Sequence, residues 1–205
     1  MTDLLEYSFF QNAIVACVLA GLVCGLAGTY IVSRRMVFLA GGMAHTCLGG
    51  VGICALAGWP VLLGAAIFSL LTGWGVLRLG NRREVREDSA IAMLWAFGMS
   101  VGIMCSYLAP EFLPGLSGYL FGNILLVNVV DLWALGILAV VVAVFYLLCM
   151  PQIVAVSFDV EFAKSRKMPA SLVNYLMISL VGLCIVCTLK VAGVVMVISL
   201  LSVPQ

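Results

Sequence analysis

The sequence predicts an all-α protein that crosses a membrane several times, because of its composition, its long apolar runs and the placement of its basic residues. Hydrophobic residues make up 64% of the 205 residues and charged residues only 9%, whereas soluble domains average about 45–50% and about 25%. A soluble fold could not cover its surface with so few charged side chains. The net charge of +1 argues against nucleic acid as a partner, since phosphates are bound by clustered Lys and Arg.

Six apolar runs are long enough to cross a bilayer, for which a helix needs roughly 20 mostly apolar residues. They are residues 12–32, 36–57, 60–79, 89–109, 131–150 and 170–189. We expect Pro151 to close the fifth run, because proline cannot donate a backbone hydrogen bond. The sequence therefore predicts a polytopic transmembrane helical bundle with six full spans.

A last apolar run, residues 191–203, begins a seventh helix after Lys190. At 1.5 Å per residue this run reaches only about 20 Å, whereas the hydrocarbon core is roughly 30 Å thick. We therefore expect a single transmembrane domain over residues 1–205 that is incomplete at its C-terminus.

The glycine-broken stretch 117–129 is too short to span and predicts an interfacial or re-entrant helix. Basic residues support this interpretation, because cytoplasmic loops of membrane proteins carry an excess of Lys and Arg. If Arg34 and Arg35 are cytoplasmic and the spans alternate, every basic residue except Lys190 falls on the cytoplasmic side. That agreement fails if residues 117–129 form a full span. The orientation also predicts an N-terminus outside the cytoplasm.

His45 is the sole histidine, and it lies in the middle of the second apolar run between two glycine pairs. An ionisable residue inside a span is costly and is a candidate functional residue. One interpretation is an ion ligand or a residue that lines a pathway; the other is a histidine bonded to a carbonyl of a neighbouring helix. Met43 and Cys47 are soft-metal ligand types, but their spacing places them on other faces of the helix.

Residues 157–169 form the longest polar segment between two spans. Asp159 and Glu161 fall in its first turn and Lys164 and Lys167 in its last, an order that suits the helix dipole. The segment is either a solvated loop or a surface on which another protein docks.

Residues 115–118 (GLSG) resemble the GxSG motif of rhomboid-type intramembrane serine proteases, which pair that serine with a histidine on a later span. Here the histidine precedes Ser117, so the serine lacks a base in the expected order. Because this base is missing, a protease is the least favoured function.

Four blocks in order along the chain resemble the membrane permease subunit of metal-type ABC importers, which carry zinc, manganese or iron. The blocks are residues 33–36 (SRRM) followed by 43–45 (MAH), residues 117–125 (SGYLFGNIL), residues 159–163 (DVEFA) and residues 190–204 (KVAGVVMVISLLSVP). Together they cover nearly the whole chain.

The resemblance implies a transport subunit of the bacterial inner membrane, without an ATPase site of its own and without a permanently bound cofactor. Its implied partners are a cytoplasmic ABC ATPase, a second permease copy in a homodimer and an extracytoplasmic metal-binding protein. The sequence itself contains no GxxxxGK[ST] nucleotide-binding motif. The resemblance assigns the substrate pathway to His45, Gly41 and Asn123, with His45 as the metal ligand. It assigns ATPase coupling to four residues of the DVEFA block and its continuation: Asp159, Glu161, Ala163 and Lys164.

The chain departs from the family pattern at three positions. Gly41 stands where the family has an Asp one turn before the histidine, Asn123 replaces another Asp, and Lys167 replaces a Gly. Without the first Asp, His45 lacks a hard, charged ligand on the same helix face. The choice among zinc, manganese and iron therefore stays open, and a non-transporting scaffold or degenerate permease is the alternative function.

Overall fold

The computed structural model describes residues 7–80, 86–108, 116–124 and 127–205, and these residues fold almost entirely into helices, with no strand among them. The helices are α1 (Ser8–Ser33), α2 (Val37–Ala57), α3 (Val61–Gly80), α4 (Glu87–Leu108), α5 (Leu116–Phe121), α6 (Val129–Phe158), α7 (Val160–Ser165) and α8 (Ala170–Ser202). The predicted all-α class is confirmed.

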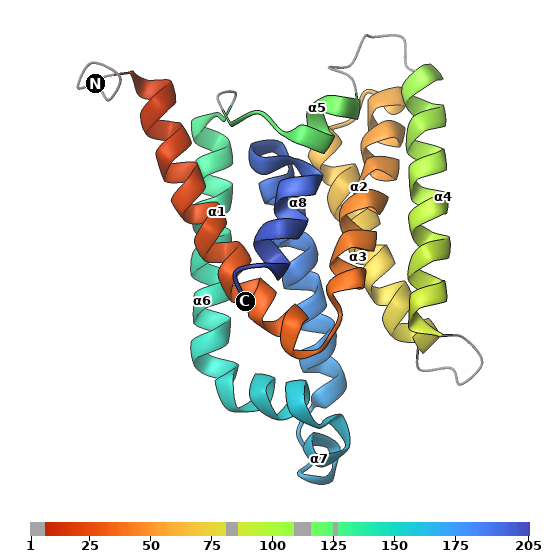
Figure 1. The fold of residues 1–205 in the computed structure, drawn as a ribbon, viewed down its shortest axis with the longest axis vertical. Helices are drawn as coiled ribbons and strands as arrows, with labels where there is room; N and C mark the ends of the chain where they lie inside the picture. The colour runs from red at the N-terminus through yellow and green to blue at the C-terminus, as the bar shows by residue number, and fades with distance from the viewer. Residues whose placement is uncertain (1–6, 81–85, 109–115, 125–126) are drawn as a thin grey trace.

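Six of the described helices are long and apolar enough to cross a membrane: α1, α2, α3, α4, α6 and α8. They run alternately up and down, with α8 in the centre of the bundle (Figure 1). α8 packs against α1, α2, α3, α5 and α6. α2 and α8 are the most buried spans, whereas α4 and α6 expose wide apolar faces. The six predicted spans are confirmed; the bounds of α1 to α4 differ from the predicted ones by at most four residues, whereas α6 and α8 run on to Phe158 and Ser202.

The short helix α5 lies at one end of the bundle, beside residues 192–193 of α8 (Figure 1). Its six residues are too few to cross a bilayer, so the prediction that residues 117–129 do not form a span holds for the described part of that stretch. The next helix, α6, begins with a capping box in which the Asn128 amide donates to Asp131 Oδ2 at 2.9 Å. Residue 115 of the GLSG motif lies outside the described residues, and so does the side chain of Ser117.

The prediction that Pro151 closes the fifth span is wrong. α6 continues through Pro151 to Phe158 and is 30 residues long. A proline removes one backbone donor and bends a helix, but the turns that follow can still form their own hydrogen bonds. Figure 1 shows the last turns of α6 bending across the base of the bundle toward α7.

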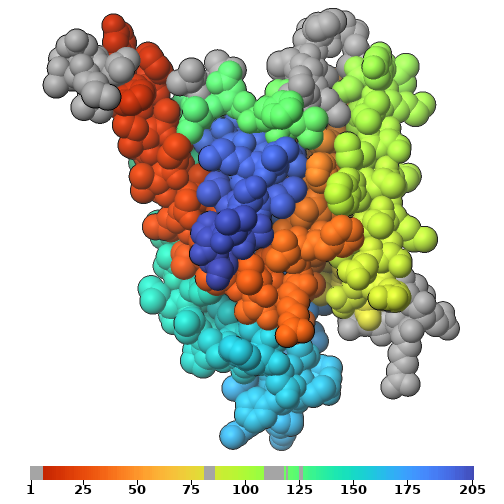
Figure 2. All heavy atoms as spheres, in the orientation of Figure 1, coloured from red at the N-terminus to blue at the C-terminus, as the bar shows by residue number. Residues whose placement is uncertain are grey.

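The last apolar run is a separate helical segment, as predicted, but it begins later than expected. The helix passes Lys190 without a break and is interrupted only at Gly193, which has a φ of 76° and a ψ of 164°. The chain then turns back into the bundle, and Figure 2 shows this segment in dark blue on the molecular face between α1 and α2. A Cβ atom on Gly28 of α1 would lie 2.4 Å from the Leu201 carbonyl oxygen, so the two backbones are in direct contact.

The described basic residues gather at the end of the bundle that carries α7, with one exception. Arg34 and Arg35 lie between α1 and α2, Arg78 ends α3, and Arg86 precedes α4. Lys190 lies at the opposite end, near α5. The predicted segregation of basic residues is therefore observed among the described residues; Arg82 and Arg83 lie outside them.

Candidate functional site

His45 lies on α2 and stacks against Trp95 of α4. The two ring centroids are 4.5 Å apart and the ring planes are inclined by 9°, so the contact is face to face. Phe38 packs at 6.0 Å on the same indole, and the indole Nε1 donates to Met99 Sδ at 3.1 Å. Aromatic pairs of this kind add about 0.5–1.5 kcal/mol beyond the area that they bury. The stack therefore fixes the plane of the imidazole.

The two nitrogens of the His45 ring have different surroundings. Nδ1 is buried and has no hydrogen-bond partner, whereas Nε2 is not among the buried, unpartnered atoms. One interpretation of His45 was a hydrogen bond to a carbonyl of a neighbouring helix. Nδ1 does not make this bond. A ligating imidazole binds an ion through one nitrogen while the other carries the proton. Nδ1 is thus enclosed in this conformation, whereas Nε2 is not.

Gly41 is buried one helical turn before His45. A Cβ atom at this position would make ordinary contact with Ile198 Cδ1, at 3.9 Å. Ile198 belongs to the segment after the break at Gly193, so the position of the family's Asp faces an apolar side chain here. Among the described residues no group of three or more His, Cys, Asp or Glu side chains could hold a metal ion.

Met43 and Cys47 are fully buried and do not join His45. A Cβ atom on Gly73 of α3 would lie 3.4 Å from Met43 Sδ, and one on Gly182 of α8 would lie 2.9 Å from Met43 Cε. Met43 therefore faces α3 and α8, whereas His45 faces α4. The structure agrees with the expectation that these residues form no common site.

Asn123 follows α5 and is tied to the opposite end of the molecule from α7. Its backbone amide donates to the Lys190 carbonyl oxygen at 3.2 Å. The Lys190 ammonium in turn pairs with Asp131 Oδ2 at 2.6 Å. The structure thus joins Asn123 to the end of the long part of α8.

A crossing of two glycines holds α5 against α8. Gly122 and Gly193 both have positive φ, 71° and 76°, a backbone conformation that glycine adopts without steric cost. A Cβ atom on Gly122 would lie 2.5 Å from the Ala192 carbonyl carbon, and one on Gly193 would lie 2.3 Å from the Phe121 carbonyl carbon. Both positions therefore require glycine, for conformation and for space.

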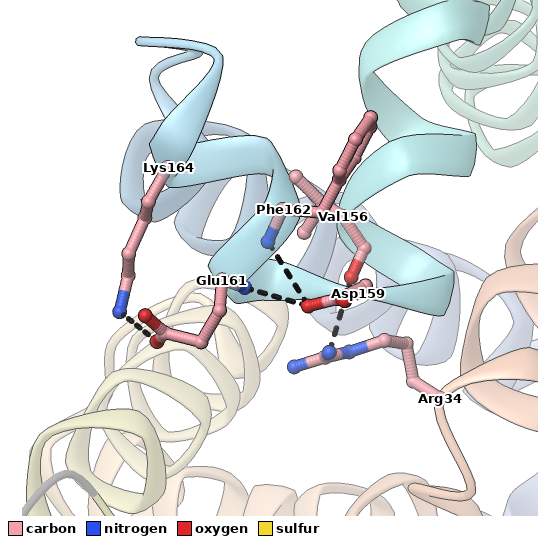
Figure 3. A network of polar contacts seen from close by, with 6 residues as sticks. All are labelled: Arg34, Val156, Asp159, Glu161, Phe162 and Lys164. Atoms are coloured by element: carbon pink, nitrogen blue, oxygen red, sulfur yellow. Dashed lines mark hydrogen bonds and ion pairs between the residues drawn. The ribbon is translucent and has the colours of Figure 1, made fainter.

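α7 and its N-cap residue carry the four residues assigned to ATPase coupling, and Figure 3 draws three of them, Asp159, Glu161 and Lys164. Asp159 caps the helix, because its Oδ1 accepts from the amides of Glu161 at 2.9 Å and Phe162 at 3.0 Å. Glu161 and Lys164 form an ion pair of 2.8 Å whose side chains are 82% and 53% exposed, so the pair adds little stability. Ala163 is fully buried. The helix is thus anchored by the buried Ala163 and the partly buried Val160, and it presents its charges outward.

Arg34, whose place in the sequence predicts only which side of the membrane it lies on, also makes a long-range contact. Its Nη1 donates to the carbonyl oxygen of Val156 at 3.1 Å, across 122 positions of sequence (Figure 3). Its Nε is buried without a hydrogen-bond partner. An arginine after a span is a common positive-inside signal, and the sequence contains no signal for the second role.

Comparison with known proteins places the whole bundle in one family. Residues 6–205 match the model of the ABC 3 transport family. A membrane protein of Synechocystis sp. is 36% identical over 204 residues, which cover 100% of this chain and 73% of that protein. The manganese transport system membrane protein MntC of Halalkalibacterium halodurans is 32% identical, over 98% of this chain and 69% of that protein.

Solved structures agree with the sequence relatives. PsaBC from Streptococcus pneumoniae, in complex with Fab, superposes with a TM-score of 0.86 at 26% identity and covers 99% of this chain and 73% of that one. An inward-facing conformation of a putative metal-chelate type ABC transporter has a TM-score of 0.72 at 16% identity, over 90% of this chain and 63% of that one, and shares the fold. The chain therefore belongs to the ABC 3 transport family.

Proposed function

We propose that the chain is the membrane permease subunit of an ABC importer for a divalent transition-metal ion: zinc, manganese or iron. The observation that carries the proposal is the family match over residues 6–205, which includes both the helix that bears His45 and the capped helix α7. Several relatives are named as membrane proteins of manganese or metal transport systems, in Halalkalibacterium, Listeria, Chlamydia and Thermotoga.

In this proposal His45 binds the ion in passage through Nε2. His45 is the eighth residue after Val37, the first residue of α2, so it lies roughly 12 Å into the helix at 1.5 Å per residue. That depth is well inside a hydrocarbon core of roughly 30 Å. The imidazole suits zinc and iron, and the ion's remaining ligands would be water, as fits a site that must bind and release. Gly41 leaves space beside it, and Asn123 belongs to the opposite, α5 end of the pathway.

The same proposal makes α7 the docking site of an ATPase on a separate chain. Its acidic N-terminal turn and basic C-terminal turn project beyond the spans at the basic end of the bundle (Figure 1). This end is then cytoplasmic, and the N-terminus and α5 face outward, where an extracytoplasmic metal-binding protein would deliver the ion. Two permease copies form a homodimer in the bacterial inner membrane, and ATP-driven movement of α7 alternately opens the pathway to either side.

One observation favours a second candidate, a non-transporting scaffold or degenerate permease. Gly41 faces Ile198, so no carboxylate from that position supports His45. The two candidates differ in metal uptake by the assembled transporter, which the scaffold lacks.

Charge reversal on α7 tests the docking part of the proposal. We expect Glu161→Lys and Asp159→Lys each to release the ATPase during co-purification and to abolish ATP-driven uptake. Asp88→Lys is the matched control, since it makes the same reversal in the first turn of α4, at the same end of the bundle. Retention of the ATPase by the Glu161→Lys permease at the level of the Asp88→Lys permease would contradict the assignment.

A further inference from the structure

The end of α6 leaves a backbone carbonyl that its own helix does not satisfy. Inside a helix the Val156 carbonyl would accept from the amide four residues later, that of Val160. α6 ends at Phe158, and Asp159 is extended, with a φ of −150° and a ψ of 105°. Val160 therefore begins a different helix, and Arg34 Nη1 donates to the Val156 carbonyl in its place, at 3.1 Å.

Arg34 is rigidly attached to the start of α2. Its amide closes α1 by donating to the Tyr30 carbonyl, and the Met36 amide reaches back to the Ile31 carbonyl at 2.9 Å. Arg35 between them is in the left-handed region, at a φ of 56°. The turn is thus fixed by backbone hydrogen bonds, and α2, the helix that bears His45, begins one residue after Met36.

We propose that Arg34 is a positioning residue that transmits movement of α7 to α2. This inference rests on the proposed role of α7 as the ATPase docking site. α7 packs chiefly against α6, so a force on α7 first reaches the turn of α6 that ends two residues after Val156. The guanidinium joins that turn to the base of α2 (Figure 3). Movement of α7 therefore displaces the helix that lines the pathway.

A purely structural role would be that Arg34 only caps α6. Loss of a cap lowers the stability of the permease but leaves the ratio of ions moved to ATP hydrolysed unchanged. Loss of a link uncouples the two activities while the ATPase remains bound. Coupling free energies between sites commonly correspond to about 5–150-fold effects. The number of ions moved per ATP hydrolysed therefore distinguishes the two roles.

The experiment uses the assembled transporter in proteoliposomes and measures ions moved per ATP hydrolysed. For Arg34→Gln we expect the ATPase to stay bound and to hydrolyse ATP, while the ratio falls at least about five-fold. Arg34→Lys should give an intermediate ratio, because an ammonium can donate to the carbonyl but lacks the planar fork of arginine. Arg35→Gln is the matched control: it removes the same charge from the adjacent, exposed side chain.

An unchanged ratio in Arg34→Gln overturns the proposal, and so does an equal fall in Arg35→Gln, which would assign the effect to net charge. Amide hydrogen exchange separates this failure from failure of the proposed function. We expect ATPase binding to change the amide exchange rates of α7 in both the wild type and Arg34→Gln. The exchange rates of residues 34–40 should change only in the wild type. A change in α7 that never reaches residues 34–40 overturns the link, whereas no change in α7 refutes the docking site itself.

Discussion

The crossing of α2 and α3 is so close that a single methyl group should destabilise the bundle. A Cβ atom on Gly50 would lie 2.0 Å from the Gly64 carbonyl oxygen and 2.3 Å from its carbonyl carbon. The reverse change, on Gly64, would place a Cβ atom 2.2 Å from the Gly50 oxygen. In lipid, small residues allow such close approach of two helix backbones, and packing supplies much of the association energy.

The expected cost of Gly50→Ala follows from these distances. The colliding atoms are backbone atoms, so no side chain can rotate away, and α2 and α3 must separate by roughly 1 Å, which forfeits up to half of each dispersion contact across the crossing. Overpacking costs about 1–3 kcal/mol, and alanine returns about 0.5–1 kcal/mol through its better helix propensity. The net loss is about 1–2 kcal/mol, which lowers Tm by about 2–8 °C in a chain of this size.

Thermal unfolding in detergent, followed by tryptophan fluorescence, measures this loss. Gly136→Ala on α6 is the control, since a Cβ atom there meets nothing within 4 Å. We expect Gly136→Ala to leave Tm unchanged or to raise it slightly. Equal shifts for the two substitutions, or a higher Tm for Gly50→Ala, would refute the close crossing.

Two further predictions concern single contacts. Breaking the Lys190–Asp131 pair by Lys190→Gln should lower the free energy of unfolding by about 1 kcal/mol, a value kept small by solvent screening because the lysine side chain is 36% exposed. In a double-mutant cycle, the double variant with Asp131→Asn should lose less stability than the two single variants lose in sum. Trp95→Leu should weaken binding of Zn²⁺ in equilibrium dialysis by about 2–12-fold, the equivalent of about 0.5–1.5 kcal/mol of stacking, while Trp95→Phe retains most of it. Equal affinity for Trp95→Leu and the wild type would show that the stack does not position His45.

Much of the fold was predictable because the bilayer imposes simple rules on length and charge. Apolar runs of sufficient length gave six spans, and the basic residues showed that the stretch with α5 does not cross. The two errors of detail have local causes. α6 passes Pro151 because a proline costs one donor without preventing the following turns, and the break in α8 lies at Gly193 because a φ of 76° requires glycine, whereas Lys190 remains helical.

The candidate site was predictable in its residue types but not in its contacts. His45 stood out as the sole histidine in an apolar run, and Asp159 as an acidic residue before a short helix. Trp95, which stacks on His45, is 50 positions away on α4, and only the packing of α2 against α4 brings the two rings together. The hydrogen bond from Arg34 to Val156 likewise depends on where α6 ends. That end was predicted too early, at Pro151.

Metal accumulation tests the central claim most directly. Cells that lack their own importers are supplied with the permease, its ATPase and its binding protein, and zinc, manganese and iron are measured by mass spectrometry. We predict energy-dependent accumulation of at least one of these metals, which His45→Ala reduces to background while the ATPase stays assembled. No accumulation of any of the three metals by the wild type, or equal accumulation by His45→Ala, would contradict a metal pathway through His45.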